Sequence, residues 1–276
     1  HCNMAKLSIP NIITSIGKGL CEDCENLEYC SIGNGISELP FDSDKYHGDP
    51  FYGTSRGMNM FDGCENLKVI DIVDSAHPLD VYNCGYDDSF VIEKTRFLGS
   101  FARFNLDSIS INRDLSYIDS SSDNYYYKVY APFAAFRTLK KAYIGGASTI
   151  VGEDFFRNCC SLECVTFGEN ITKIDGSVFY NCDNLKQIML ESTIPPSFTS
   201  GAFSHSQLLS IKIIVPDGCV DTYMQTKGWK EFLNIVDETS AGIDEIRAND
   251  SDDSLVVNEE GIIYIGESVE DIYVYG

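Results

Sequence analysis

The sequence lacks several features that would place the protein in a common functional class. No apolar run reaches the length of about 18 residues that a transmembrane helix needs. Basic residues are few, because 20 Lys and Arg stand against 42 Asp and Glu and give a net charge of −22. This balance excludes a basic surface for nucleic acid or for anionic lipid. The chain begins at His1 without a secretory signal peptide, which indicates a processed or shortened N-terminus.

Catalytic and cofactor-binding motifs are also missing. The sequence has no phosphate-binding G-x-x-x-x-G-K-S/T motif, no G-x-S-x-G and no H-E-x-x-H, and no G-x-G-x-x-G follows a predicted strand. His47, His77 and His205 are scattered and have no motif around them, so surface histidines are favoured over catalytic ones. We therefore expect no enzymatic activity and no cofactor.

Acidic residues gather in short clusters that match calcium sites poorly. None of them has the D-x-D/N-x-D/N-G spacing of a calcium-binding loop, so solvated turns are favoured over metal sites. The clusters are Asp42 with Asp44, Asp87 with Asp88, and Asp250 with Asp252 and Asp253.

What the sequence does contain is an internal repeat. Apolar residues make up 43% of the chain, an ordinary fraction for a folded protein, and they recur in one frame with a main step of 23 residues. The clear copies are Phe156-x-x-Cys159-x-x-Leu162-x-x-Val165-x-Phe167, Phe179-x-x-Cys182-x-x-Leu185-x-x-Ile188-x-Leu190, Cys21-x-x-Cys24-x-x-Leu27-x-x-Cys30-x-Ile32 and Phe61-x-x-Cys64-x-x-Leu67-x-x-Ile70-x-Ile72. Weaker copies are Phe133-x-x-Phe136-x-x-Leu139-x-x-Ala142-x-Ile144, Leu106 with Ile109 and Ile111, and Leu208 with Ile211 and Ile213.

The repeat extends to both the start of the chain and the far side of each coil. Met4, Leu7 and Ile9 hold the strand positions one step before Leu27, so the chain opens inside a repeat, through truncation or as a half-coil cap. A pair of apolar residues three apart follows most strands and predicts a short extended or turn segment on the opposite wall. These pairs are Ile13 and Ile16, Ile36 and Leu39, Leu115 and Ile118, and Ile171 and Ile174, with poorer copies at Ala76 and Leu79 and at Ser148 and Val151.

This periodicity predicts a solenoid. The L-x-x-I-x-I half alternates with period two, as a strand with one buried face does. The F-x-x-C half spaces apolar residues three apart, as one helical or 3₁₀ turn would. A single coil cannot bury its own interior, whereas stacked coils share one core. We expect about eight coils in a stack roughly 34 Å long, at about 4.8 Å per strand.

The repeat resembles the BspA-like branch of bacterial leucine-rich-repeat proteins over about residues 1–236. The resemblance implies an α/β repeat solenoid, namely a right-handed leucine-rich-repeat coil with short strands and short helical turns. It also implies a cell-surface or secreted bacterial protein with a role in adhesion or host-protein binding, and no catalytic residues.

The C-terminal part predicts a cap, a linker and a small β segment. Residues 215–236 are similar to the closing segment of that family, in which Trp229 and Phe232 would cover the last coil. There Asp217 would N-cap a short helix and Gly228 would end it. Residues 237–250 predict a polar linker, and 251–276 three short strands that resemble the start of a sorting domain. The strands are expected at 255–257, 262–265 and 272–275.

Eleven cysteines raise the question of metal or disulfide bonding. Cys21 and Cys24 have the spacing of zinc ligands, but no second C-x-x-C exists. Stacked core thiols are favoured over zinc and over disulfides, because buried cysteine is a small apolar residue. The stack comprises Cys24, Cys64, Cys159 and Cys182, all at one repeat position.

Three insertions interrupt consecutive coils and carry the strongest functional signal. They span residues 40–56, 80–95 and 119–128, and each follows the second apolar pair, so they are expected to leave one face of the solenoid together. Seven of their 43 residues are tyrosine, against 16 of 276 in the whole chain, a composition typical of recognition loops. The alternative is that the tyrosines only pack the loops onto the coils. They are Tyr46, Tyr52, Tyr82, Tyr86, Tyr125, Tyr126 and Tyr127.

Together these features predict a non-catalytic, adhesin-like binding protein at the cell surface or secreted. The expected partner is a protein or a glycan. We expect the protein to be a monomer that neither binds nucleic acid nor inserts into a membrane. A glycan-handling enzyme that uses the insertion face and a structural spacer remain the alternatives. The spacer is disfavoured because the insertions are local rather than uniform.

Overall fold

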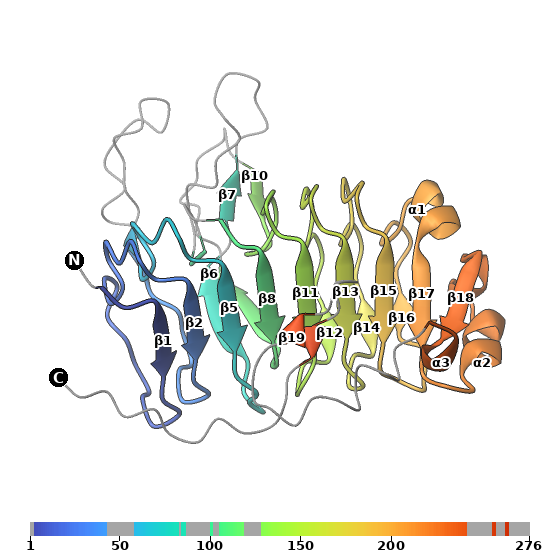
Figure 1. Cartoon of the computed structure of the whole chain (residues 1–276), viewed down its shortest axis with the longest axis horizontal. Helices are drawn as coiled ribbons and strands as arrows, with labels where there is room; N and C mark the ends of the chain where they lie inside the picture. Colours follow the sequence, from blue (N-terminus) through green and yellow to red (C-terminus); the bar gives the residue numbers. More distant parts are fainter. Residues whose placement is uncertain are drawn as a thin grey trace.

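One long parallel sheet forms the front wall of the molecule (Figure 1). The computed structural model describes residues 3–42, 58–82, 84–86, 100–101, 105–118, 128–241, 256–257 and 263–264. Nine strands follow one another along the sheet in chain order, each contributed by one coil. They are β1 (Lys6–Ile9), β2 (Tyr29–Ile32), β5 (Val69–Ile72), β8 (Ser108–Ile111), β11 (Lys141–Ile144), β13 (Cys164–Phe167), β15 (Gln187–Leu190), β17 (Lys212–Val215) and β18 (Asn234–Asp237).

The strand register confirms the repeat, including its most irregular part. Leu7 lies opposite Cys30 in the first pair of strands, as the 23-residue step predicts. Ile70 lies opposite Ile109 although 39 residues separate them, so the insertion between these strands leaves the pairing in frame. The inward residues of each strand stack on those of its neighbours and form one continuous core.

The second wall confirms the apolar pairs that follow the later strands, whereas Ile13 of the first pair is 37% exposed and lies in no strand. It contains two short parallel sheets, which lie behind the front sheet in Figure 1. One pairs β6 (Leu79–Tyr82) with β9 (Leu115–Ile118), and the other joins β12 (Ile150–Val151), β14 (Lys173–Ile174) and β16 (Ser197–Phe198). These extended segments close the coils at the back, so apolar residues from both walls meet in the interior.

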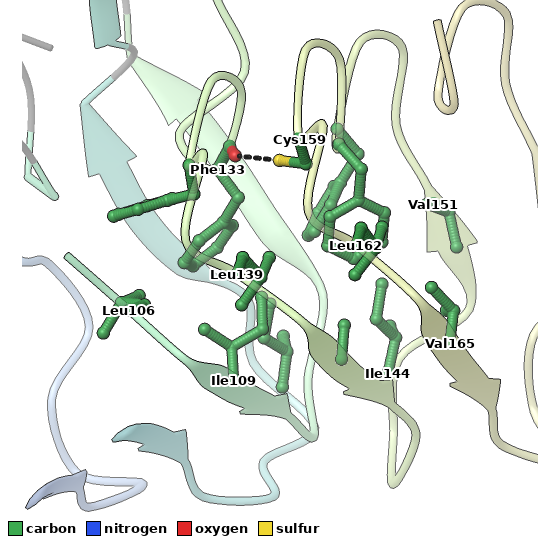
Figure 2. Packing of buried hydrophobic residues seen from close by; sticks show 14 of the residues in the cluster. Leu106, Ile109, Phe133, Leu139, Ile144, Val151, Cys159, Leu162 and Val165 are labelled. Carbon is green, nitrogen blue, oxygen red and sulfur yellow. Dashed lines mark hydrogen bonds between the residues drawn. The ribbon is translucent and has the colours of Figure 1, made fainter. Parts of the chain in front are cut away.

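The F-x-x-C segments form tight turns, and their cysteines form a buried ladder. The turns have hydrogen bonds between residues three apart, such as Cys182 N to Phe179 O at 3.1 Å. The thiol of Cys159 donates to the carbonyl oxygen of Phe133 at 3.2 Å, above Leu139 and Leu162 (Figure 2). Equivalent bonds join Cys182 to Phe156 at 3.0 Å and Cys64 to Cys21 at 3.1 Å. The four repeat cysteines are at most 3% exposed and form no disulfide bond.

The last complete coil departs from the predicted frame. Ile213, rather than Ile211, lies opposite Ile188, so the assignment of Leu208, Ile211 and Ile213 to the repeat was wrong by two residues. The shift arises because the turn is replaced there by helix α1 (His205–Ser210), which begins with a capping box between Ser204 and Gln207.

Gln207 takes over the place of the ladder cysteine in this coil. Its side-chain amide donates to the carbonyl oxygen of Phe179 at 3.0 Å, just as the thiols do in the preceding coils. The ladder therefore depends on a donor at this position rather than on sulfur.

The C-terminal end of the core is closed by a small cap. Helix α2 (Val220–Gln225) and the 3₁₀ helix η2 (Trp229–Glu231) bring Trp229 onto the last coil, where it is fully buried and its indole N–H donates to Pro196 O at 2.6 Å. Phe232 is 4% exposed and packs beside it. This confirms the predicted covering of the core.

Two details of the predicted cap were wrong. Cys219, not Asp217, is the N-cap of α2, and Asp217 instead accepts hydrogen bonds from Thr239 N at 3.0 Å and Thr239 Oγ1 at 2.7 Å. Helix α2 ends at Gln225 with Thr226 as its C-cap, and Gly228 is instead the N-cap of η2, with φ of 90°, a conformation that favours glycine. A Cβ there would approach the Phe198 ring to 2.7 Å.

The chain continues as solenoid past the predicted boundary at residue 236. Strand β18 joins the front sheet through Asp237, and helix α3 (Glu238–Ala241) follows directly, so the cap extends into the predicted linker. Strands β19 (Val256–Val257) and β20 (Ile263–Tyr264) lie within two of the predicted strands and pair with each other antiparallel. The third predicted strand, 272–275, lies outside the described residues.

Candidate functional site

The three insertions leave the solenoid from adjacent positions on the second wall. Tyr82, the last residue of β6, lies directly opposite Ile118, the last residue of β9. Glu38 and Asp80 form an isolated parallel β-bridge. Counting two residues further along both segments places Pro40 opposite Tyr82. The exit points therefore lie side by side on three consecutive coils. Because β6 runs to Tyr82, the second insertion begins there rather than at the predicted residue 80.

Short antiparallel ribbons form the described bases of the insertions. Strands β3 (Phe41–Asp42) and β4 (Met58–Asn59) pair where the first insertion leaves and returns. Strand β7 (Cys84–Tyr86) in the second insertion pairs with β10 (Lys128–Tyr130) at the end of the third. In Figure 1 this second ribbon rises from the upper edge of the sheet. It ties two insertions together, so their bases form one unit.

The structure describes only two of the seven candidate tyrosines. Tyr86 lies in β7 opposite Lys128, and Tyr82 lies in β6. The remaining five lie outside the described residues and are Tyr46, Tyr52, Tyr125, Tyr126 and Tyr127.

Tyr82 packs onto the solenoid. Its hydroxyl donates to Glu38 Oε1 at 2.9 Å, and its ring centroid lies 5.5 Å from that of the buried Phe41. Partial burial, together with the bond to Glu38 and the nearby Asp80, raises the pKa of the phenol. For this tyrosine the contacts support the packing alternative.

Ser100 holds the point where the second insertion returns, and its role was missed in the sequence. Its hydroxyl accepts from Tyr82 N at 2.9 Å and donates to Leu39 O at 3.3 Å, while its own N–H donates to Tyr82 O at 3.2 Å. The next residue, Phe101, is fully buried between Phe61 and Phe133. The available signal was the pair Ser100-Phe101, in which the aromatic residue lies one position after the place that the repeat frame assigns to it.

A buried arginine clamps the coils below the exits. Arg113 is 1% exposed, and its Nη1 donates to Ile36 O at 2.8 Å and to Asn34 O at 3.4 Å, across the intervening coil. Burial lowers the pKa of this guanidinium. The contact fixes the distance between the coils that carry the first and third insertions.

A polar network on the outer face of the front sheet was also missed. Asp71 projects outward from β5 and accepts hydrogen bonds from Ser31 Oγ at 3.2 Å, Tyr29 OH at 3.4 Å and Asn112 Nδ2 at 3.4 Å. Burial raises the pKa of Asp71, and burial beside this carboxylate raises the pKa of Tyr29 to about 12. The outward positions of different strands become neighbours only through the register, which explains why the sequence did not reveal the network.

The described residues contain no group of three His, Cys, Asp or Glu side chains placed to hold a metal ion. Helices α1 and α2 have six residues each. No helix in the described part of the chain is long and apolar enough to cross a membrane. The described groups near the insertion bases are hydrogen-bonding and aromatic side chains.

Parallel strands, one per coil, and a repeated L-x-x-I-x-I core define a leucine-rich-repeat protein. The chain matches the family described as BspA type Leucine rich repeat region in six copies, over residues 1–43 and 97–219. This match covers more than half of the chain, so the protein belongs to the BspA-type leucine-rich-repeat family.

The comparison with solved structures gives a similar bacterial protein. It is the crystal structure of a leucine rich cell surface protein from Faecalibacterium prausnitzii A2-165, with 15% identity and a TM-score of 0.25. The alignment covers 78% of this chain and 64% of that one. A search of the curated proteins finds no match.

Proposed function

We propose that this protein is a non-catalytic, adhesin-like binding protein, exposed at the cell surface or secreted, that recognises a protein or glycan partner through its three insertions. The observation that carries the proposal is the common exit of the insertions beside Pro40, Tyr82 and Ile118. Insertions that merely interrupted the repeat would have no reason to leave from register partners on consecutive coils. Membership of the BspA-type family supports a role at the surface.

The bases of the insertions are pre-positioned. The β7/β10 ribbon, the Ser100 bonds and the Arg113 clamp fix the distances between the exits before a partner arrives. Pre-positioning lowers the ordering cost that binding has to overcome. The tyrosines in the insertions offer large contact areas with few rotatable bonds.

The charge of the insertions favours a neutral or cationic partner. They contain nine acidic and four basic residues, within a chain of net charge −22. An anionic partner would be repelled during its approach, whereas a cationic one would be steered toward this edge.

The test is to remove one insertion without cutting the ribbon. Residues 119–127 are replaced by a two-residue turn, and Lys128 is kept because it pairs with Tyr86. We expect the melting temperature to change little, since solenoid coils contact only their neighbours. Binding on an array of glycans and host proteins should be lost, while Ile150→Ser, a 47% exposed residue of the second wall, should bind normally. Unchanged binding after the replacement would contradict the proposal.

A further inference from the structure

The turns of three successive coils form a ledge that continues the edge from which the insertions project. We define the ledge as residues 133–137, 154–160 and 177–184. Its turns are joined by backbone hydrogen bonds, from Ala135 N to Arg157 O at 2.6 Å and from Asn158 N to Tyr180 O at 2.8 Å. The first turn follows directly on β10, the end strand of the third insertion. Tyr180 therefore lies two coils from the insertions, about 10 Å at the usual strand spacing.

Tyr180 is exceptional among the aromatic residues of the described chain. Its side chain is 50% exposed, whereas every other described Phe, Tyr or Trp side chain is buried or only partly exposed. Leaving an aromatic ring in water forgoes the stabilisation that its burial would give. The repeat does not require this exposure, because the equivalent residues Arg157 and Ala134 are not aromatic.

The ring of Tyr180 is held in place by a cation on one side. The guanidinium carbon of Arg157 lies 4.2 Å from the ring centroid. Nη1 of the same arginine bonds to Asp154 Oδ1 at 3.0 Å, which fixes the guanidinium over the ring. An exposed ring whose orientation is already fixed loses little conformational entropy when a ligand stacks on it.

Two side-chain amides come from the residues that directly follow Arg157 and Tyr180 in their turns. Asn181 Nδ2 donates to Asn158 Oδ1 at 2.9 Å across the two coils. This bond uses one polar atom of each amide, so Asn181 Oδ1 and Asn158 Nδ2 supply an acceptor and a donor at the surface. Asp183 and Asn184 of the same turn are exposed and add further polar groups.

We propose that this ledge is a binding subsite for a neutral glycan, in which a sugar ring stacks its C–H face on Tyr180 and its hydroxyls bond to Asn158 and Asn181. An isolated aromatic ring among amides fits a sugar, because the ring covers the apolar face while the amides satisfy the hydroxyls. Protein hot spots instead gather several apolar side chains in one desolvated cluster. Of the exposed apolar residues nearest in sequence, Ile150 and Ile194 belong to the opposite wall or to its loops, and Leu209 is a single side chain in α1 of the next coil. The net charge of −22 disfavours an acidic glycan.

This inference rests on the proposed function, since it extends the insertion face and chooses a glycan as the partner. A glycan chain that contacts the third insertion could continue along the ledge to Tyr180 without leaving the same edge of the solenoid. The two proposals fail separately, because the insertions and the ledge can be altered independently.

The experiment starts from an array of neutral oligosaccharides probed with the whole chain. The strongest ligand is then titrated calorimetrically against Tyr180→Ala, Tyr180→Phe and Arg157→Ala. We expect at least a tenfold weaker Kd for Tyr180→Ala and a several-fold weaker one for Arg157→Ala. Tyr180→Phe should bind almost normally, because it keeps the ring. The control is Ile194→Ala, which removes a 76% exposed apolar side chain away from the ledge and should not change the Kd.

Melting curves of all variants show whether the fold is retained, which we expect because Tyr180 is half exposed. Binding of Tyr180→Ala at the strength of the unaltered chain would overturn the glycan subsite, even if the chain without residues 119–127 loses binding. An array on which no neutral oligosaccharide binds would also overturn it, whereas capture of a protein through the insertions would leave the proposed function standing.

Discussion

The regular coils after residue 131 and the interrupted coils before it solve the same packing problem in different ways. In the regular part the ladder of Cys159, Cys182 and Gln207 repeats one hydrogen bond from coil to coil. In the interrupted part the same bond occurs between Cys64 and Cys21, and contacts made only once, those of Ser100 and Arg113, are added to it. The front sheet keeps its register through both parts. Insertions are therefore tolerated where they leave a solvent-facing corner, because lengthening a loop costs little closure entropy.

The largest expected effect is at the capped end of the regular part. Trp229→Ala should lower the free energy of unfolding by about 3–5 kcal/mol, because it leaves a large cavity and removes the bond to Pro196. Urea denaturation followed by circular dichroism measures the change. Leu233→Ala is the matched control, since this side chain is 74% exposed and should matter little. A loss below about 1 kcal/mol for Trp229→Ala would show that the cap does not seal the core.

The next effect tests the interrupted part. Arg113→Met should lower the free energy of unfolding by about 2 kcal/mol, because the buried carbonyl of Ile36 loses its charged hydrogen-bond donor. Hydrogen exchange should accelerate in residues 33–36 and at the exits, but not in the coils after residue 150. The control Lys186→Met removes an exposed ion pair with Glu163 and should cost less than about 0.5 kcal/mol. Uniform acceleration along the whole chain would contradict a local clamp.

A smaller effect is expected in the thiol ladder. Cys182→Ala should cost about 1–2 kcal/mol, since it removes the bond to Phe156 O and leaves a small void. Cys182→Ser should lower the free energy of unfolding by less than Cys182→Ala does, because a hydroxyl can donate to the same carbonyl. Burial raises the pKa of the Cys182 thiol, so reagents for thiolates should modify the half-buried Cys160 first. Rapid native-state labelling of Cys182 would refute the buried ladder.

The smallest effect concerns a strained turn where the two parts meet. Ala135 has φ of 62°, a conformation that other coils assign to Asn158, Asn181 or Gly63. Ala135→Gly should therefore stabilise the protein by about 0.5 kcal/mol, as measured by the shift of the urea midpoint. Its neighbour Ala134 lacks a positive φ, so Ala134→Gly should destabilise by a similar amount. The same sign for both variants would rule out strain as the cause.

Much of the fold could be predicted from the sequence, because each coil repeats a local pattern. Leu7, Ile70 and Ile109 all occupy the strand positions that the 23-residue frame assigns to them. The frame was wrong around Leu208, because a capping box at Ser204 and Gln207 favours a helix over a turn there. Local capping chemistry can shift a degenerate repeat by two residues when its apolar anchors are ambiguous.

Less of the candidate site could be predicted. The common exit of the insertions follows from counting residues between anchors, and the register of Tyr82 with Ile118 agrees with it. The Tyr180 ledge, the Arg113 clamp and the Asp71 network could not be found in this way. Each combines residues from different coils. Insertions set the spacing between the partners of Arg113 and of Asp71, whereas Asn158 and Asn181 of the ledge lie one 23-residue repeat apart and only the tertiary structure decides how their turns are exposed.

The sequence by itself determined the solenoid, its buried thiols and the positions of the insertions, because these depend on contacts between neighbours one repeat apart. Tertiary structure decided which polar and aromatic groups from different coils meet. Tyr180 lies against Arg157 only because both turns present the same position to solvent, and Arg113 reaches Ile36 only because their coils are stacked with a single coil between them. The physical reason is that apolar burial repeats with the chain, whereas surface contacts depend on how the finished coils are stacked.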